Sequence, residues 1–420
     1  VPGSFPRLQA ESDLVASAVL KLLRSFFRCL KNLYKLGGGE RMDFRLSEEQ
    51  EMIRKMARDF ADNEILPYCQ EWDEHHTFPW DTVKKLQELG LMTCGVPAEY
   101  GGPGIDHLGQ CIISEEICRG DAGLGTTLAA STLLGPDPVY VAASDEQKKW
   151  FYGRMMEGAL TAFCLTEPGA GSDAGGISTR CVKDGDYYIL NGTKQFISNG
   201  GVANLYTVFA TLDKKMGYKG MCAFMVDRDS PGISTSPPEN KLGIRSSNTT
   251  QVIFEDVRVP AQNLLGKEGD GFKIAMKTLD ISRAVVGAMA TGVAQGAFEC
   301  AVKYAQERQQ FGKPIASFQG IQFIIAEMAV LCETARLLYQ KAASNQDSGL
   351  PYTKMASLAK YWGGEAAMKV STDAVQVYGG YGYTKDYLAE KYFRDAKIFQ
   401  IFEGTAQIQK IVIAGDVFRN

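Results

Sequence analysis

The period of the hydrophobic pattern changes twice along the chain, and this limits the folds that the chain can adopt. Residues 42–160 show helical spacing, residues 161–275 show short strand-like runs, and helical spacing then returns and continues to the C-terminus. Because no helix-length segment separates the strands, we expect an antiparallel, barrel-like or sandwich sheet. The 420 residues also exceed what one hydrophobic core usually supports. We therefore predict a multidomain α+β protein.

Turn and cap residues indicate where the predicted elements begin and end. Ser47 precedes a glutamate-rich stretch, as helix N-cap residues do, and Asn191-Gly192 is a hairpin-type pair. The C-terminal part predicts a bundle of four to five antiparallel helices, over 281–309, 318–347, 353–377 and 386–417. The predicted domains are an extension over 1–41, a helical domain over 42–160, a β-domain over 161–275 and a helix bundle over 276–420.

The first 41 residues differ from the rest of the chain. Residues 14–36 place lysine and arginine at helical spacing on one face and apolar side chains on the other, before a Gly-Gly-Gly run. A basic amphipathic helix of this kind contacts a membrane surface, docks on a partner or targets an organelle. Since the stretch that begins at Met42 looks like a natural start and the chain opens with valine, an upstream extension without a catalytic role is an equal interpretation.

Composition argues against several classes of protein and site. A formal net charge of −4 gives no basic surplus for binding nucleic acid. The ten cysteines include no C-x-x-C pair, and no uncharged apolar run reaches the roughly 18 residues that span a membrane. The last of only three histidines is at position 107. We therefore expect no metal site, and a C-terminal base that is a carboxylate, Tyr, Lys or Cys.

Two glycine-containing segments are candidates for ligand binding. From Phe163 to Asp173 a strand runs into a Pro-Gly-Ala-Gly-Ser loop, whose backbone N–H groups and hydroxyls can approach a ligand closely. Residues 379–382, Gly-Gly-Tyr-Gly, end a predicted helix, and C-capping accounts for only one of these glycines. The loop matches no dinucleotide or P-loop pattern, so an ordinary turn is its alternative interpretation.

Two charged side chains, Arg308 and Glu403, are candidates for ligand binding and for catalysis. Arg308 precedes Gln-Gln-Phe-Gly-Lys-Pro, and either its cation stabilises a helix C-terminus or its guanidinium binds a pyrophosphate. Glu403 lies beside Gly404 inside an apolar run, where burial would raise its pKa toward that of a base acting near neutral pH. The alternative for Glu403 is an exposed glutamate on a helix surface, the commoner place for this residue type.

In this order and spacing, the four segments resemble the acyl-CoA dehydrogenase family, close to its short-chain, medium-chain and related bacterial members. The resemblance covers the chain from Met42 to the C-terminus. It implies an N-terminal helical domain, a middle antiparallel β-domain and a C-terminal helix bundle, assembled as a homotetramer with FAD at subunit interfaces. It also implies an acyl-CoA substrate, an electron-transfer flavoprotein as partner, and fatty acid β-oxidation in the bacterial cytoplasm or the mitochondrial matrix.

The resemblance also assigns roles to single residues. Glu403 matches the catalytic base, and Ser282 stands where some family members carry the base on an earlier helix. At Phe196 and Ser198 the family commonly has Trp and Thr, so the stacking area beside the flavin differs here. The positions that match cofactor contacts are Phe163, Leu165, Thr166, Gly171, Ser172, Phe196, Ile197, Ser198, Arg308, Gln310, Phe311, Gln319, Gln376, Gly379, Gly380, Thr405 and Gln407. The positions that match substrate contacts are Ser172, Asp280, Arg283 and Gly404.

The activity implied by the resemblance is α,β-dehydrogenation of an acyl-CoA thioester to the trans-2-enoyl-CoA. Glu403 takes the α-proton, its backbone N–H and a flavin ribityl hydroxyl hold the thioester oxygen, and the β-hydrogen leaves as hydride to FAD. The alternatives are an acyl-CoA oxidase, an enoyl-CoA reductase of the same fold, and a catalytically idle assembly partner. The acyl group stays open; candidate pocket residues are Leu279, Tyr378, Tyr381, Tyr383 and residues 128–134.

Overall fold

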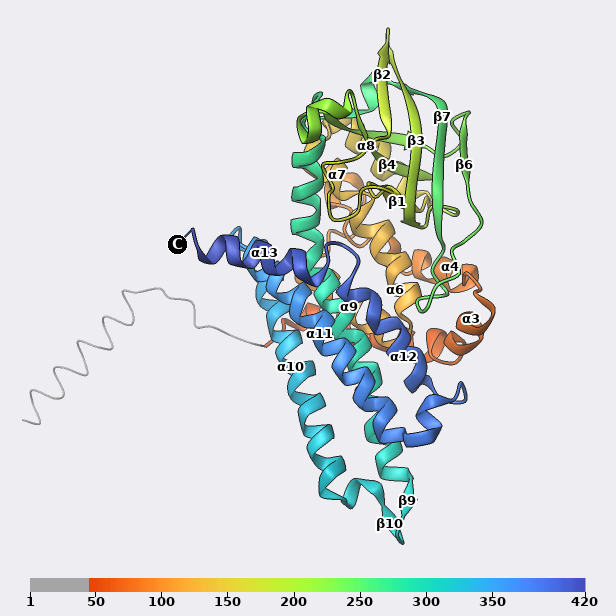
Figure 1. Cartoon of the computed structure of the whole chain (residues 1–420), viewed down its shortest axis with the longest axis vertical. Coiled ribbons are helices and arrows are strands. Elements are labelled where there is room, and N and C mark those ends of the chain that lie inside the picture. The colour runs from red at the N-terminus through yellow and green to blue at the C-terminus, as the bar shows by residue number, and fades with distance from the viewer. Residues whose placement is uncertain (1–44, 420) are drawn as a thin grey trace, which may run out of the picture. The chain divides into compact units, whose positions relative to one another are not determined.

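The structure is a computed structural model that describes residues 45–419 (Figure 1). The predicted extension over 1–41, with the membrane or partner contact expected through residues 14–36, lies outside the described residues. From Glu48 onward the chain forms one compact unit. This unit is helical up to residue 156, strand-rich from 161 to 265 and helical again from 271, which confirms the predicted order of α, β and α. The domain boundaries themselves stay a prediction.

The N-terminal helices begin at polar cap residues. Asp106 and Asp121 each accept a hydrogen bond from a backbone N–H in the first turn of α5 and of α6. Ser144 and Gln147 form a reciprocal capping box at α8. The elements of this part are α2 (Glu48–Phe60), η1 (Ala61–Ile65), α3 (Cys69–His75), α4 (Trp80–Glu88), η2 (Leu91–Thr93), η3 (Ala98–Tyr100), α5 (His107–Gly120), α6 (Ala122–Ala129), η4 (Ala130–Leu134), α7 (Asp137–Ala142) and α8 (Asp145–Met156).

The strands form one sheet in the order β6-β7-β3-β2-β4-β5-β8, with β1 beside β4. Most pairs are antiparallel, as expected, but β1 and β2 each pair with β4 in parallel. An alternating pattern marks a segment as a strand without giving the direction of its neighbour, so the sequence did not reveal these two pairs. The strands are β1 (Thr161–Cys164), β2 (Arg180–Asp184), β3 (Tyr187–Ser198), β4 (Leu205–Thr211), β5 (Met221–Asp227), β6 (Ile233–Thr235), β7 (Thr249–Pro260) and β8 (Leu264–Leu265).

The C-terminal helices form the predicted bundle, with one correction. The single helix expected over 386–417 is wrong, because a non-helical turn at residues 401–405 interrupts it. This turn holds two successive residues at positive φ, which a continuous helix cannot contain. The elements are α9 (Gly271–Glu307), β9 (Gln309–Gln310), β10 (Lys313–Pro314), η7 (Ile315–Ser317), α10 (Gln319–Asp347), α11 (Thr353–Tyr378), η8 (Gly379–Tyr383), α12 (Leu388–Ala396), η9 (Lys397–Gln400) and α13 (Ala406–Val417).

Helix α9 runs through the centre of the bundle and contacts α5, α10, α11 and α12 (Figure 1). Its small side chains allow close approach: a Cβ added at Gly292 would lie 2.1 Å from the Glu115 carbonyl oxygen of α5. Among the described helices, α9 is the one long and apolar enough to cross a membrane, but 72% of its most apolar window is buried inside the protein. Packing in the core therefore accounts for its apolar composition.

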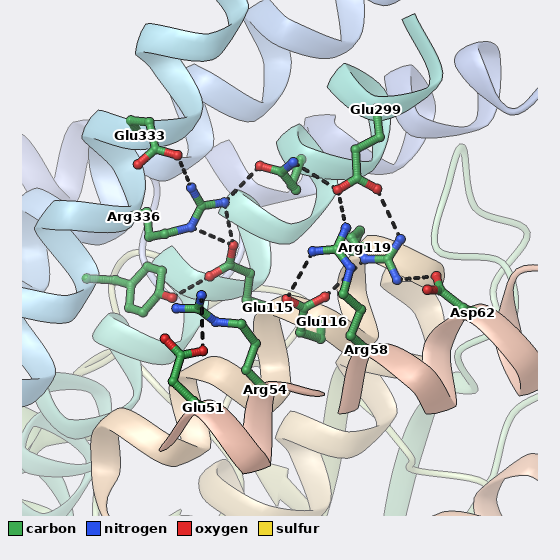
Figure 2. Close-up of polar contacts among 12 residues, drawn as sticks. Glu51, Arg54, Arg58, Asp62, Glu115, Glu116, Arg119, Glu299, Glu333 and Arg336 are labelled. Atoms are coloured by element: carbon green, nitrogen blue, oxygen red, sulfur yellow. Dashed lines mark hydrogen bonds and ion pairs between the residues drawn. The ribbon is translucent and has the colours of Figure 1, made fainter. Parts of the chain in front are cut away.

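A network of ion pairs joins α2 and α5 to α9 and α10 (Figure 2). Arg119 of α5 pairs with Glu116 at 3.0 Å and with Glu299 of α9 at 3.1 Å. Arg336 of α10 reaches Glu115 of α5 at 2.8 Å. These charges are largely buried, and each is paired, as buried charges must be. The network therefore fixes how the N-terminal helices sit on the bundle.

Candidate active site

Glu403 lies in the turn between η9 and α13, where the backbone leaves helical geometry. The φ angle is +52° at Glu403 and +88° at Gly404. A Cβ at position 404 would lie 2.7 Å from Gln409 Nε2, which donates to the carbonyl oxygens of Gly404 (3.1 Å) and Glu403 (3.3 Å). A non-glycine residue held at positive φ costs about 1–3 kcal/mol, and such residues cluster at functional sites. The turn is therefore built to present Glu403.

Two buried side chains from neighbouring helices hold this turn. Ser282 Oγ of α9 donates to Glu403 Oε2 at 2.7 Å. Lys360 Nζ of α11 donates to the carbonyl oxygen of Gly404 at 2.6 Å. The other carboxylate oxygen of Glu403, Oε1, accepts no hydrogen bond from a described residue. One oxygen is thus anchored and the other is left to accept a proton.

The surroundings of Glu403 make its carboxylate more basic than an exposed one. Burial raises the pKa of Glu403 above its ordinary value, and this outweighs the Ser282 hydrogen bond and the charges of Lys360 and Arg283, which lower it. Burial likewise lowers the pKa of Lys360, to about 8. The residue as a whole is half-buried in a turn, so the alternative of an exposed glutamate on a helix surface is wrong.

Asp280 and Arg283, two positions expected to contact substrate, form an ion pair on α9 beside Ser282. Thr353 Oγ1 of α11 donates to the other oxygen of Asp280 at 3.0 Å. Arg283 is buried, and its Nε has no hydrogen-bond partner among the described residues. Its charge also lies close enough to lower the pKa of Glu403. The structure therefore brings the predicted base and these two residues together.

A buried ion pair holds the loop over residues 163–172. Lys194 Nζ of β3 lies 2.8 Å from Glu167 Oε1. Glu167 also accepts hydrogen bonds from the backbone N–H groups of Ser178 (2.6 Å) and Thr179 (2.9 Å). Burial alone would raise the pKa of Glu167, but Lys194 and these donors lower it to about 2. The loop is thus fixed at its base, while its tip is exposed.

We expect Glu167→Gln to lower the free energy of unfolding by about 3 kcal/mol at pH 7, because it leaves Lys194 buried without its counter-ion. In the wild type this contribution is present above the ordinary glutamate pKa of about 4.5 and is lost as the pH falls toward 2. The difference between the two proteins in chemical unfolding should therefore narrow below pH 4.5. The control Asp184→Asn, which removes an exposed pair with Arg258, should change little. A constant difference from pH 7 to pH 3 would contradict this account.

An exposed aromatic ring lies beside this loop. Phe196 has a φ of +56° and the residue is 64% exposed. The adjacent Gln195 N–H donates to the carbonyl oxygen of Thr166 at 2.8 Å, so residues 196–198 lie next to the loop 163–172. A flat apolar face at the edge of a glycine-containing loop can stack on a planar ligand.

The segments around Arg308 and residue 380 meet in a second place, a groove of about 830 Å³. The predicted residues that line it are Arg308, Gln310, Phe311, Gly379 and Gly380. The Arg308 guanidinium lies 5.2 Å from the centre of the Tyr381 ring and forms no ion pair with a described residue. Gln319 and Gln376, two further predicted residues, are exposed. Each directly precedes a residue that lines the groove, Gly320 or Val377.

Within one chain, this groove is separate from Glu403. Figure 1 places β9 and β10, which follow Arg308, at the opposite end of α10 from α13. Tyr378 lies in the groove, where its ring stacks on Tyr304 with 4.0 Å between ring centres, and Tyr381 also lines it. The structure therefore places the candidate pocket residues Tyr378 and Tyr381 in this groove, apart from Glu403 of the same chain.

Sequence reasoning missed three residues near Glu403: Lys360, Gln409 and Asp137. A lysine or glutamine inside a helical pattern carries no local sign of burial, so no pattern identifies the first two. Asp137 lies between two prolines just beyond the expected pocket residues 128–134, and the Pro-Asp-Pro run itself could have drawn attention to it.

The residues present fit FAD. Phe196 offers a stacking face beside the loop, and Arg308 has no carboxylate partner among the described residues, which suits a pyrophosphate. A Cβ added at Gly379 or Gly380 would meet nothing within 4 Å, so ligand or protein can approach the backbone there. Among residues 45–419, no group of three His, Cys, Asp or Glu side chains could hold a metal ion.

Family models match almost the whole described chain. A model for "Acyl-CoA dehydrogenase, N-terminal domain" matches residues 47–159, one for "Acyl-CoA dehydrogenase, middle domain" matches residues 162–257, and one for "Acyl-CoA dehydrogenase, C-terminal domain" matches residues 269–418. The three matches follow one another without overlap in the order of the helical, sheet and bundle parts.

Individual proteins give the same picture. The chain is 46% identical over 379 residues to a short-chain specific acyl-CoA dehydrogenase from Clostridium acetobutylicum, covering 90% of this chain and 100% of that protein. It is 47% identical over 383 residues to an acryloyl-CoA reductase (NADH) from Anaerotignum propionicum, covering 90% and 97%. The solved butyryl-CoA dehydrogenase from Megasphaera elsdenii is similar in structure, with a TM-score of 0.88, 42% identity, and coverage of 90% and 100%.

Proposed function

This chain belongs to the acyl-CoA dehydrogenase family, and on that basis we propose that it oxidises a short-chain acyl-CoA thioester between Cα and Cβ. It is an FAD-dependent oxidoreductase acting on CH–CH donors. The observation that carries the proposal is the buried carboxylate of Glu403, held at one oxygen by Ser282. The short-chain preference rests on relatives whose names specify short-chain or butyryl substrates.

Glu403 is the base that removes the α-proton. Its raised pKa gives it more affinity for that proton than an exposed glutamate has, and its free Oε1 can accept it. FAD, when bound, accepts the hydride from Cβ. The protein's part is to hold the thioester so that the α-proton faces the carboxylate and water is excluded.

The backbone N–H of Glu403 stabilises the charge that develops on the thioester oxygen. Among the described residues it donates no hydrogen bond, although the N–H groups before it at Ile401 and Phe402 both do. A fixed, unused donor beside the base acts as an oxyanion-hole group, because it needs no reorganisation when charge develops. Asp280, Arg283, Ser172 and Gly404 contact the substrate.

We expect Ser282→Ala to move the acidic limb of the kcat/KM profile to higher pH. Loss of the hydrogen bond to Glu403 raises the pKa of the carboxylate further, so less of it is ionised at low pH. On that limb kcat/KM should fall by about tenfold, since a hydrogen bond to a charged group contributes about 1.5–3 kcal/mol. The profile should be measured from pH 5 to pH 9, with Ser348→Ala on the surface as control. If the acidic limb of the kcat/KM profile did not shift, the Ser282 hydrogen bond would not set the pKa of Glu403.

FAD is held by two sets of residues, which we propose come from two chains. The ring system lies by the loop 163–172 and by Phe196-Ile197-Ser198, with Thr405 and Gln407 close to Glu403. The pyrophosphate and adenosine contact the groove of Arg308, Gln310, Phe311, Gln319, Gln376, Gly379 and Gly380. This groove lies at the far end of the bundle from Glu403. The position favours a neighbouring subunit as the source of the groove residues that contact the same FAD.

We propose that the assembly is a homotetramer. Exposed apolar side chains recur at seven-residue spacing along α10, at Phe323, Val330 and Leu337. Such a stripe on one helix face is typical of a surface that another subunit covers. Light scattering coupled to size-exclusion chromatography tests the tetramer directly.

The electron acceptor is the second part of the function to be tested. We propose an electron-transfer flavoprotein, in the bacterial cytoplasm or the mitochondrial matrix. The match to an acryloyl-CoA reductase favours the reverse reaction, enoyl-CoA reduction, as the second candidate. Stopped-flow reoxidation of substrate-reduced enzyme with electron-transfer flavoprotein or with oxygen separates a dehydrogenase from an oxidase. A bleachable flavin in the purified enzyme argues against the idle assembly partner.

A further inference from the structure

A second carboxyl group, that of Asp137, is buried near Glu403 and has no role in the mechanism above. Asp137 is the first residue of α7 and is 8% exposed. Its Oδ2 is buried and has no hydrogen-bond partner among the described residues. Leaving such a group unpaired is costly, so native structures keep it only where something else satisfies it.

The backbone of Asp137 is restricted by its neighbours, and its helix lies against a helix of the active site. Pro136 and Pro138 flank it and restrict the backbone on both sides. Helix α7 packs against α9, the helix that carries Ser282, the donor to Glu403. One turn before Ser282 on the same face of α9, Thr278 has a second buried hydroxyl without a partner.

The charge around Asp137 keeps its proton in place. Burial, and then the nearby carboxylate of Glu403, raise the pKa of Asp137 well above its ordinary range, and no cation opposes them. Two carboxyl groups in one site separate into an ionised one and a protonated one. With Glu403 ionised as the base, Asp137 is a neutral carboxyl group that can donate one hydrogen bond and accept others.

We propose that Asp137 is a specificity-determining residue, whose buried, unpartnered carboxyl group hydrogen-bonds to an uncharged polar group on the acyl moiety. This rests on the proposed function, since it assumes that the acyl group bound at Glu403 extends as far as α7. The substrate class is then an acyl-CoA thioester with a hydroxyl or similar group beyond the reacting carbons, in preference to a plain alkanoyl-CoA. A site built around a buried polar group discriminates against a ligand that leaves that group unpaired.

The test compares two substrates that differ by one atom group, pentanoyl-CoA and 4-hydroxybutyryl-CoA, in which a hydroxyl replaces the terminal methyl. In the wild type we expect kcat/KM to favour the hydroxy substrate by at least about tenfold. Asp137→Asn, which resembles the neutral acid in shape and still hydrogen-bonds, should keep that preference. Asp137→Leu, similar in shape but apolar, should reverse it. The surface control Asp145→Asn should match the wild type.

Two results overturn the proposal. One is a preference of the wild type for pentanoyl-CoA. This measurement needs no variant, so it tests the proposal even if Asp137→Leu fails to fold. The other is a folded, flavin-containing Asp137→Leu whose substrate ratio equals that of the wild type. Either result leaves Glu403 as the base untouched, whereas failure of the proposed function shows as turnover of neither thioester by the wild type.

Discussion

Glu403→Gln should lower kcat by a factor of about 10²–10⁴, the usual contribution of a positioned general base. Glutamine keeps the shape of the side chain and can still accept the hydrogen bond from Ser282, but it cannot take up the α-proton. Bound FAD and substrate affinity should stay close to wild type, because neither depends on the charge of this carboxylate. The measurements are the flavin absorbance ratio, a binding titration and steady-state turnover.

The matched control for this change is Glu157→Gln, an exposed glutamate at the end of α8. It makes the same chemical change away from the turn and should leave kcat unaltered. If Glu403→Gln turned over at near the wild-type rate, the base would have to be another group, such as Asp280 beside Ser282 on α9.

Lys391→Met should lower the free energy of unfolding by about 3–5 kcal/mol, the usual cost of breaking a buried ion pair. Lys391 Nζ of α12 lies 2.6 Å from both Asp121 Oδ1 and Asp395 Oδ2, and all three residues are buried. Burial alone would lower the pKa of Lys391, but the two aspartates raise it well above its ordinary range, so it is a cation. Lys391→Met therefore leaves the buried carboxyl groups of Asp121 and Asp395 without their shared cation.

The effect should be large because this cluster joins three parts of the fold. Asp121 caps α6 in the N-terminal helices, and Asp395 Oδ1 accepts a hydrogen bond from the Ile244 N–H at 2.6 Å, in the segment between β6 and β7. Chemical unfolding followed by tryptophan fluorescence measures the loss. Lys149→Met is the control, since it removes an exposed pair with Asp145 worth only a few tenths of a kcal/mol. A loss below about 1 kcal/mol for Lys391→Met would contradict the account.

Much of the fold was readable from the sequence because its determinants are local. Helical and strand periods, the Asn191-Gly192 turn and the Ser144 cap each act within a few residues, so the α, β, α order followed from them. The directions of the strand pairs β1–β4 and β2–β4 did not, since they depend on how distant segments return to the sheet.

The sequence by itself determined which residue types stand at the site: the glutamate beside a glycine, the glycine-containing loop, and the arginine before Gln-Gln-Phe-Gly. Only the tertiary structure decided that the last predicted helix breaks at residues 401–405, that Lys360 and Asp137 lie near Glu403, and that the Arg308 groove lies away from it. The reason is physical. A carboxyl group's basicity and a lysine's burial are set by whatever packs around them, and here those neighbours are 43 to 266 positions away along the chain.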